Sequence, residues 1–160
     1  MGSCKTPVQE GAKESVDPYT KPLLEANRYM QERNREQITA FINRTGWEMK
    51  ETSTGLWYMI LEPGEGEQIS GENFVVYSYE TKLLSGKFCY SADTINPKKI
   101  VIGKGSVEVG IEEGLKLLRE NSRARFIIPP YLAHGNFGDR QEIPGAAILL
   151  VEVDVIRVRR

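Results

Sequence analysis

Hydrophobic and polar positions follow two different periods along this chain, and the change falls near Gly55. Before Gly55, apolar residues recur three and four positions apart, which predicts an amphipathic helix from about Pro22 to Asn43. These residues are Leu23, Ala26, Met30, Ile38 and Phe41. Thr20 is a suitable N-cap, Pro22 fits the first helical turn, and Gly46 offers a C-terminal stop.

The apolar stripe of this helix is interrupted, because residues 31–37 (QERNREQ) include no apolar side chain. We therefore expect the helix to dock at its ends or against a partner. A solvated spacer helix with two anchoring patches is the alternative.

After Gly55 the apolar period becomes two, as in β-strands. Strands are predicted at 56–61, 74–84, 88–91, 99–102, 124–128 and 147–158, with one helix at 109–120 and a long loop at 131–146. One helix among five or six strands predicts an α+β fold.

The chain divides into three segments by composition. Residues 1–20 are polar and aperiodic, which is typical of a flexible tether. Residues 21–52 form the N-terminal helical extension, and residues 53–160 form the main domain.

Composition excludes several kinds of function. The net charge of −1 gives no reason to expect nucleic acid as a partner, and no apolar run approaches the length of a membrane span. Two cysteines and one histidine form no metal-ligand spacing, and no G-x-S-x-G motif is present. We expect neither a metal nor another cofactor.

Motifs in a fixed order carry a resemblance to a known family. They are VVYSY (75–79), GKFCYS (86–91), IG (102–103), VEVGIEEGL (107–115), PP (129–130), LAHG (132–135), IP (143–144) and the last apolar strand. In this order and spacing the chain resembles the FKBP family of peptidyl-prolyl isomerases over about 100 residues, from Leu56 to Val158. The resemblance implies a bent antiparallel sheet wrapped around one short helix. With its N-terminal helix, the chain looks similar to bacterial lipoprotein members.

The resemblance also implies a site. Tyr79 stands at the position of the family's pocket tyrosine, and Val107 and Ile143 also match the family. His134 takes the place of a loop tyrosine whose hydroxyl donates to the ligand, so Tyr79 and His134 are the candidate catalytic residues. The other reading makes Tyr79 a core aromatic residue and His134 a solvated histidine.

Several substrate-binding positions depart from the family pattern. Ile111 replaces the tryptophan that floors the pocket, and Cys89, Val151 and Lys98 replace aromatic residues. Tyr90 replaces a carboxylate. Glu108 replaces an apolar residue whose backbone N–H binds ligand carbonyls. Cys89 and Ile111 are also good core residues whether or not anything binds above them.

Two functions are therefore expected. The first is a peptidyl-prolyl isomerase of reduced or altered activity, acting on Xaa-Pro bonds of exported proteins. The alternative is a binding or chaperone module that keeps the fold while its catalytic pocket has degraded. Proline-containing polypeptides are the expected partners in both cases, and the chain is expected to be a monomer or a weak dimer through its N-terminal helix.

Cys4 is the candidate lipidation site. Ser3-Cys4 fits the end of a bacterial lipobox, which predicts a lipid anchor in the cell envelope, facing the periplasm. The alternative is a cytoplasmic protein with an acylated N-terminus, because residues 1–6 match the myristoylation pattern. A membrane contact is expected only through such an anchor.

Overall fold

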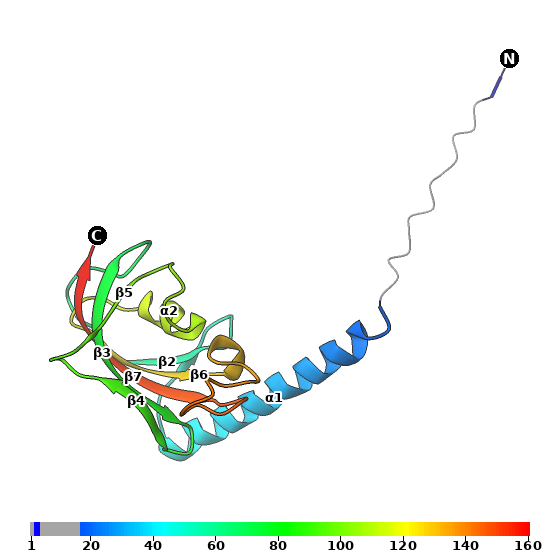
Figure 1. Cartoon of the computed structure of the whole chain (residues 1–160), viewed down its shortest axis with the longest axis horizontal. Helices are drawn as coiled ribbons and strands as arrows, with labels where there is room; N and C mark the ends of the chain where they lie inside the picture. The colour runs from blue at the N-terminus through cyan, green and yellow to red at the C-terminus, as the bar shows by residue number, and fades with distance from the viewer. Residues whose placement is uncertain (1, 4–16) are drawn as a thin grey trace.

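The computed structural model describes residues 2–3 and 17–160. Figure 1 shows the order of the elements along the chain. The helices are α1 (Thr20–Thr45), α2 (Val109–Leu115) and the short 3-10 helix η1 (Pro130–Leu132). The strands are β1 (Lys50–Glu51), β2 (Trp57–Glu62), β3 (Phe74–Leu83), β4 (Phe88–Ala92), β5 (Lys98–Val101), β6 (Arg123–Ile128) and β7 (Leu149–Arg159). The predicted α+β class is confirmed.

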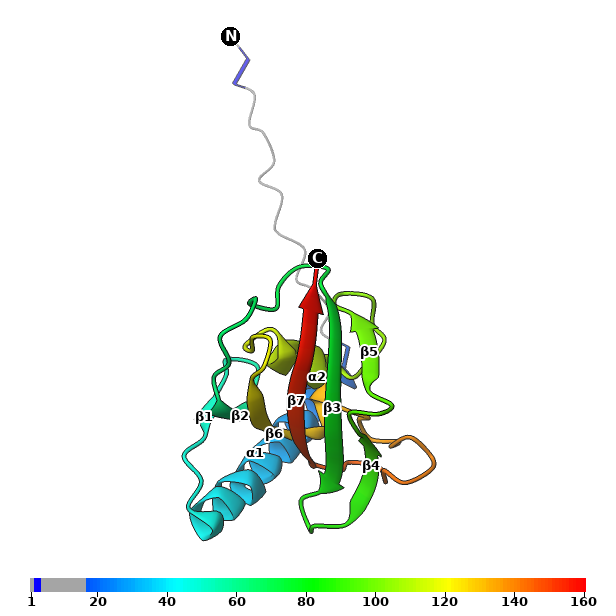
Figure 2. The same ribbon diagram turned by 90° about the vertical axis from the view of Figure 1, so that its left-hand side faces the viewer.

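All seven strands join one antiparallel sheet, in the order β1-β2-β6-β7-β3-β4. Strand β3 has a divided edge: its first half pairs with β5 and its second half pairs with β4. The two-residue strand β1 is an addition that the sequence pattern did not predict. Figure 2 shows β7 and β3 in the middle of the sheet, with α2 behind them.

The main core fills the space between the sheet and α2. Side chains at alternate strand positions point to α2, as the strand period of two requires. The fully buried members include Val75, Leu115, Leu118, Phe126 and Leu149. Val76 is 9% exposed and lies outside this cluster, because its neighbour Val75 takes the α2 side.

Two glycines allow α2 to lie close to β6. A Cβ on Gly114 would come within 2.6 Å of Phe126 Cζ, and one on Gly110 within 2.5 Å of Ile128 Cγ2. Gly110 and Gly114 are four residues apart and share one helix face, so the backbone of α2 itself faces β6 there. The ring of Phe126 occupies the space that a side chain would need.

Helix α2 ends at Leu115, so the predicted continuation to Glu120 is wrong. After Lys116, the N–H groups of Leu117 and Leu118 donate to the carbonyls of Gly114 and Leu115, three residues back, in turn geometry. The carbonyl of Leu118 then accepts from Ile69 N at 3.0 Å. Tertiary pairing with residues 68–69 thus ends a helix that the apolar period alone would continue.

Helix α1 begins differently from the prediction and ends as predicted. Its N-cap is Tyr19 and no side chain caps it, so the assignment of Thr20 as N-cap is wrong. Thr20 is the first helical residue, and its backbone N–H donates to the Asp17 carbonyl in the preceding turn at 2.9 Å. Gly46 stops the helix in a left-handed conformation, φ 72°, and donates to the Ile42 carbonyl.

Only the C-terminal half of α1 docks, on the face of the sheet opposite α2. Ile38 is 1% exposed and packs with Ile127 and Ile148, whereas Leu23 and Leu24 are each 62% exposed. The expected docking at both ends is therefore wrong for the N-terminal end.

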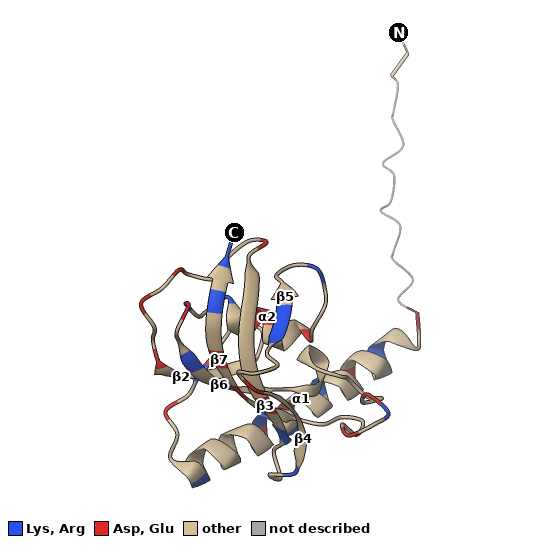
Figure 3. Cartoon of the chain, turned by 60° about the vertical axis from the view of Figure 1, so that its left-hand side comes forward, with Lys and Arg blue, Asp and Glu red and all other residues tan. Residues whose placement is uncertain are grey.

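An aromatic and ionic cluster fixes the chain just after α1. The guanidinium of Arg125 lies 4.5 Å above the Trp47 ring and forms an ion pair with Glu152 at 2.9 Å. Arg123 pairs with the same carboxylate. Figure 3 colours the acidic and basic positions along the chain. No helix in the described part of the chain is long and apolar enough to cross a membrane.

Candidate functional site

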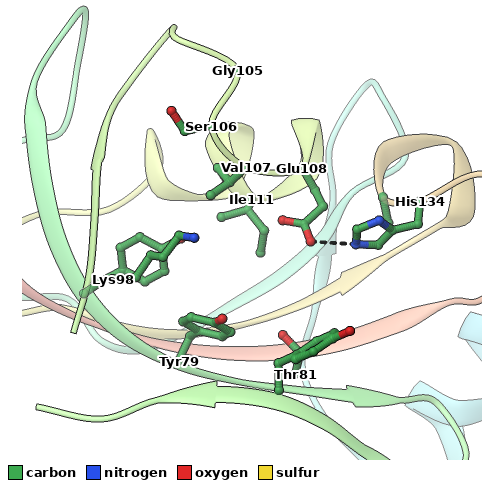
Figure 4. Close-up of a pocket in the computed structure, with 12 residues that line it drawn as sticks. Tyr79, Thr81, Lys98, Gly105, Ser106, Val107, Glu108, Ile111 and His134 are labelled. Carbon is green, nitrogen blue, oxygen red and sulfur yellow. Dashed lines mark hydrogen bonds and ion pairs between the residues drawn. The ribbon is translucent and has the colours of Figure 1, made fainter. Parts of the chain in front are cut away.

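A cavity of about 370 Å³ opens on the α2 side of the sheet. Its lining comes from β3, β4, β5, the segment leading into α2 and the residues after η1. We call it the cleft; Figure 4 shows it. The lining residues are Tyr77, Tyr79, Thr81, Tyr90, Lys98, Gly105, Ser106, Val107, Glu108, Ile111, Ala133 and His134.

Strand β3 supplies one wall of the cleft. Tyr77, Tyr79 and Thr81 share a face because they are two residues apart. The rings of Tyr77 and Tyr79 lie 5.8 Å apart at 45°. Burial, followed by the nearby charge of Glu108, raises the pKa of both phenols. Both hydroxyls therefore stay protonated at neutral pH and can donate hydrogen bonds.

The start of α2 supplies the floor and a backbone donor. Val107 and Glu108 lead into the helix, and Ile111, only 6% exposed, lies at the bottom. Glu108 is the N-cap residue and has an extended backbone, φ −56° and ψ 144°. Its backbone N–H donates to no acceptor among the described residues. A carbonyl entering the cleft can accept from this group.

His134 and Glu108 form a contact at one end of the cleft. His134 Nε2 lies 2.7 Å from a carboxylate oxygen of Glu108, and both side chains are about one quarter exposed. Figure 4 shows the pair as a dashed line. The contact connects the segment before α2 to the residues after η1, so it fixes two parts of the cleft lining relative to one another.

A second contact fixes the loop that follows His134. The Tyr90 hydroxyl donates to the Asp139 carboxylate, which also accepts from the backbone N–H groups of Gln141 and Ile143 at 2.9 Å each. The Tyr90 hydrogen bond lowers the pKa of Asp139, and the same bond raises the pKa of Tyr90. We call this pair the Tyr90–Asp139 latch, since it ties β4 to the loop.

The structure brings together six of the nine candidate residues of the main domain. These are Tyr79, Tyr90, Val107, Glu108, Ile111 and His134. Cys89, Ile143 and Val151 do not line the cleft; they are 5%, 2% and 1% exposed and belong to the main core. The short side chains of Cys89 and Val151 remain in the core, and burial raises the pKa of the Cys89 thiol. Cys4 lies outside the described residues.

Five lining residues were not predicted from the sequence: Tyr77, Thr81, Gly105, Ser106 and Ala133. The first two could have been found, because Tyr79 and the strand period already place residues 77 and 81 on the same face. Asp139 was missed as well, and a contact 49 residues away in sequence from Tyr90 leaves no local pattern. Within the described residues, no three histidine, cysteine or acidic side chains gather as metal ligands would.

Fold and cleft together define a class of protein, in which a bent antiparallel sheet wraps one short helix below an aromatic-walled cleft. The family follows from the sequence of this same region. Residues 65–156 match the family described as FKBP-type peptidyl-prolyl cis-trans isomerase, and the chain belongs to that family.

Bacterial relatives extend the similarity beyond this region. A probable FKBP-type peptidyl-prolyl cis-trans isomerase, FkpA of Neisseria meningitidis, is 30% identical over 127 residues, which is 78% of this chain and 46% of the relative. The crystal structure of FkpA from Escherichia coli matches with a TM-score of 0.67 and 27% identity, over 88% of this chain and 70% of that one.

A peptidyl-prolyl cis-trans isomerase structure from Pseudomonas syringae has a TM-score of 0.70 at 22% identity, covering 83% and 96% of the two chains. At that identity the match concerns the fold alone. The chain spans less than half the length of the curated relatives that it matches.

Proposed function

We propose that the protein is a peptidyl-prolyl cis-trans isomerase that binds Xaa-Pro segments of exported proteins in the cleft. One observation carries the proposal: Tyr79, Val107, Ile111 and the unpaired N–H of Glu108 line one cavity in a member of this family. The cavity combines an apolar floor, an aromatic wall and a donor for a carbonyl.

The physical demand of the reaction fits such a cavity. Rotation about a peptide bond crosses a barrier of about 18–20 kcal/mol set by amide resonance. The twisted transition state loses this resonance and part of the charge separation of the carbonyl. An apolar cavity therefore binds the twisted state better than the planar one, and catalysis needs no nucleophile.

Individual residues take roles in this scheme. Ile111 would lie beneath the proline ring, and the Glu108 N–H would bind a substrate carbonyl. The Tyr79 hydroxyl would donate a second hydrogen bond from the opposite wall. His134 is held by Glu108 at the end of the cleft, where it would contact the chain next to the proline.

A binding or chaperone module without catalysis is the second candidate. It is favoured by Cys89, Ile143 and Val151, three positions of the family's pocket that lie in the core here and add no surface to the cleft. The loss of aromatic area reduces what a proline ring can contact, by about 25 cal/mol for each Å² of apolar surface.

The rate of cis–trans isomerisation of an Xaa-Pro peptide separates the two candidates. It can be measured by NMR as exchange between the cis and trans signals of the peptide. The protein should accelerate exchange over buffer, and Tyr79→Phe should lower kcat/KM about two- to ten-fold, as the loss of one neutral hydrogen bond implies. Tyr29→Phe is a matched control, because this α1 residue is 57% exposed and far from the cleft along the chain. A rate equal to that of buffer would leave only the binding module.

The location in the cell belongs to the same proposal. The bacterial relatives and the Ser3-Cys4 sequence support a protein of the bacterial cell envelope, anchored by a lipid on Cys4. Mass spectrometry of the protein from its native membrane should find an acylated Cys4. An unmodified thiol there would exclude the anchor.

A further inference from the structure

We propose that Lys98 selects proline-containing segments that carry a carboxylate side chain next to the proline. The proposal rests on the proposed function, since it assumes that the cleft receives such segments. It concerns a residue at the edge of the cleft that neither apolar packing nor the hydrogen bonds described above involve.

The register of β5 on β3 directs the Lys98 side chain. Lys98 pairs with Tyr77, and the next residue, Lys99, pairs with Val76. Cross-strand partners lie on the same face of a sheet. Because Tyr77 lines the cleft, Lys98 points into it, and Lys99 points to the other face. Figure 4 shows the Lys98 ammonium directed towards Ile111, and Figure 3 shows the basic stretch of β5.

The charges of the cleft are divided between its two ends. Glu108 and His134 contact each other at one end, at 2.7 Å. Lys98 lies at the other end (Figure 4), and no ion pair within 4.0 Å joins its ammonium to a carboxylate of the described residues. The cleft thus holds one cation that its own residues leave without a counter-charge.

A bound segment changes the surroundings of this cation. A substrate that covers the ammonium removes water from it, and an apolar neighbour gives nothing in return. A carboxylate beside the proline restores a partner and is also attracted before contact. The same carboxylate placed at the other end would face Glu108, so only the Lys98 end favours it. Discrimination therefore comes from attraction at one end and repulsion at the other.

The test compares peptides that differ in one residue next to the proline, either before or after it. Each position is occupied in turn by Glu and by its uncharged isostere Gln. The wild-type protein should favour Glu over Gln about three-fold in kcat/KM at one position, as expected for a partly exposed ion pair. The preference should shrink at 0.5 M salt, where screening shortens to a few ångström.

Variants assign the preference to one side chain. Lys98→Met keeps an unbranched side chain of nearly the same length without the charge and should bring the Glu-to-Gln ratio to about one. Lys98→Glu should favour a Lys peptide over a Gln peptide. Lys99→Met removes an equal charge from the other face of the same strand and should keep the wild-type ratio. Circular dichroism of each variant confirms that the sheet has formed.

The outcomes separate this inference from the proposed function. Acceleration of every peptide with no Glu preference at either position would overturn the inference and leave the isomerase intact. So would a preference that survives in Lys98→Met. If no peptide is accelerated, the isomerase proposal fails. The role of Lys98 is then decided by the dissociation constants of the same peptides, measured by NMR titration, with the same Glu-to-Gln ratios expected for the wild type and each variant.

Discussion

The two main helices of this protein lie on opposite faces of one sheet, and they differ in what holds them in place. Helix α2 has seven residues, of which Gly110, Ile111, Gly114 and Leu115 are buried. Helix α1 has 26 residues, of which only Asn34 and Ile38 are buried. Seven residues are too few to form a stable helix alone in water. Packing therefore maintains α2, whereas α1 depends on its own length and on a short docked segment.

The largest expected effect comes from truncating the buried face of α2. Leu115→Ala should lower the free energy of unfolding by about 2–5 kcal/mol, because Leu115 is fully buried against the sheet. Leu24→Ala, the same change at a 62% exposed position of α1, should cost less than about 0.5 kcal/mol. Denaturant titration measures both. Similar losses at the two positions would remove the distinction between the helices.

Removing α1 altogether is expected to have the next largest effect. Deletion of residues 1–50 should leave a monomeric domain that still unfolds cooperatively. Its stability should fall by about 1.5–3 kcal/mol, because burial of Ile38 against Ile127 and Ile148 is lost. Calorimetry and sedimentation of the deleted protein measure this. Loss of a cooperative transition would show that α1 completes the core, and a change of oligomeric state would make α1 a dimerisation arm.

A smaller loss is expected from one methyl group on α2. Gly114→Ala should destabilise the protein by about 1–3 kcal/mol, because the new Cβ would overlap the Phe126 ring. Alanine is otherwise the better helix former by about 1 kcal/mol. A stabilised Gly114→Ala variant, judged by its thermal midpoint, would mean that α2 can move away from β6 and is not maintained by close packing.

The smallest effect should be confined to the α2 face and should depend on pH. The lowered pKa of Asp139 means that the latch stabilises the fold above the ordinary aspartate range and is lost as pH falls through the lowered value. The raised pKa of Tyr90 means that the stabilisation of the fold by the Tyr90 hydroxyl is lost only as pH rises through this raised pKa. The amide protection factors of residues 139–143, which divide out the intrinsic pH dependence of exchange, should therefore be highest between these limits.

Two tyrosine variants test the origin of that pH window. Tyr90→Phe should abolish it, while Tyr29→Phe on α1 should preserve it. A pH window that persists in Tyr90→Phe would assign the protection of this loop to another group.

Sequence patterns predicted the parts of this fold that local periodicity controls. The period of two predicted the bounds of β3 and β7 to within two residues of those in the structure. Gly46 ends α1 as predicted, because a left-handed glycine stops a helix without help from residues distant in sequence. The end of α2 could not be read in this way, since Leu118 leaves the helix to pair with Ile69.

The lining of the cleft was predicted correctly where a position of the family's pocket still faces the cleft in this structure. Tyr79, Ile111 and His134 reach it, but Val151 does not, because a position that suits a phenylalanine ring need not bring a shorter side chain to the same surface. Tyr77 was missed although its alternation with Tyr79 was visible. The Asp139 contact joins a strand to a loop across 49 residues, so only the folded chain reveals it.

The exposed half of α1 also has a mechanical consequence. At 1.5 Å per residue, the helix Thr20–Thr45 is about 39 Å long. Since Gly46, Trp47 and Ile38 fix one end to the sheet, the other end is held at a set distance from the domain. A lipid on Cys4 would then be separated from the domain by the undocked part of this helix as well as by the residues that precede it. Such a spacer determines how far from its attachment point the protein can meet an extended polypeptide, independently of how tightly the cleft binds it.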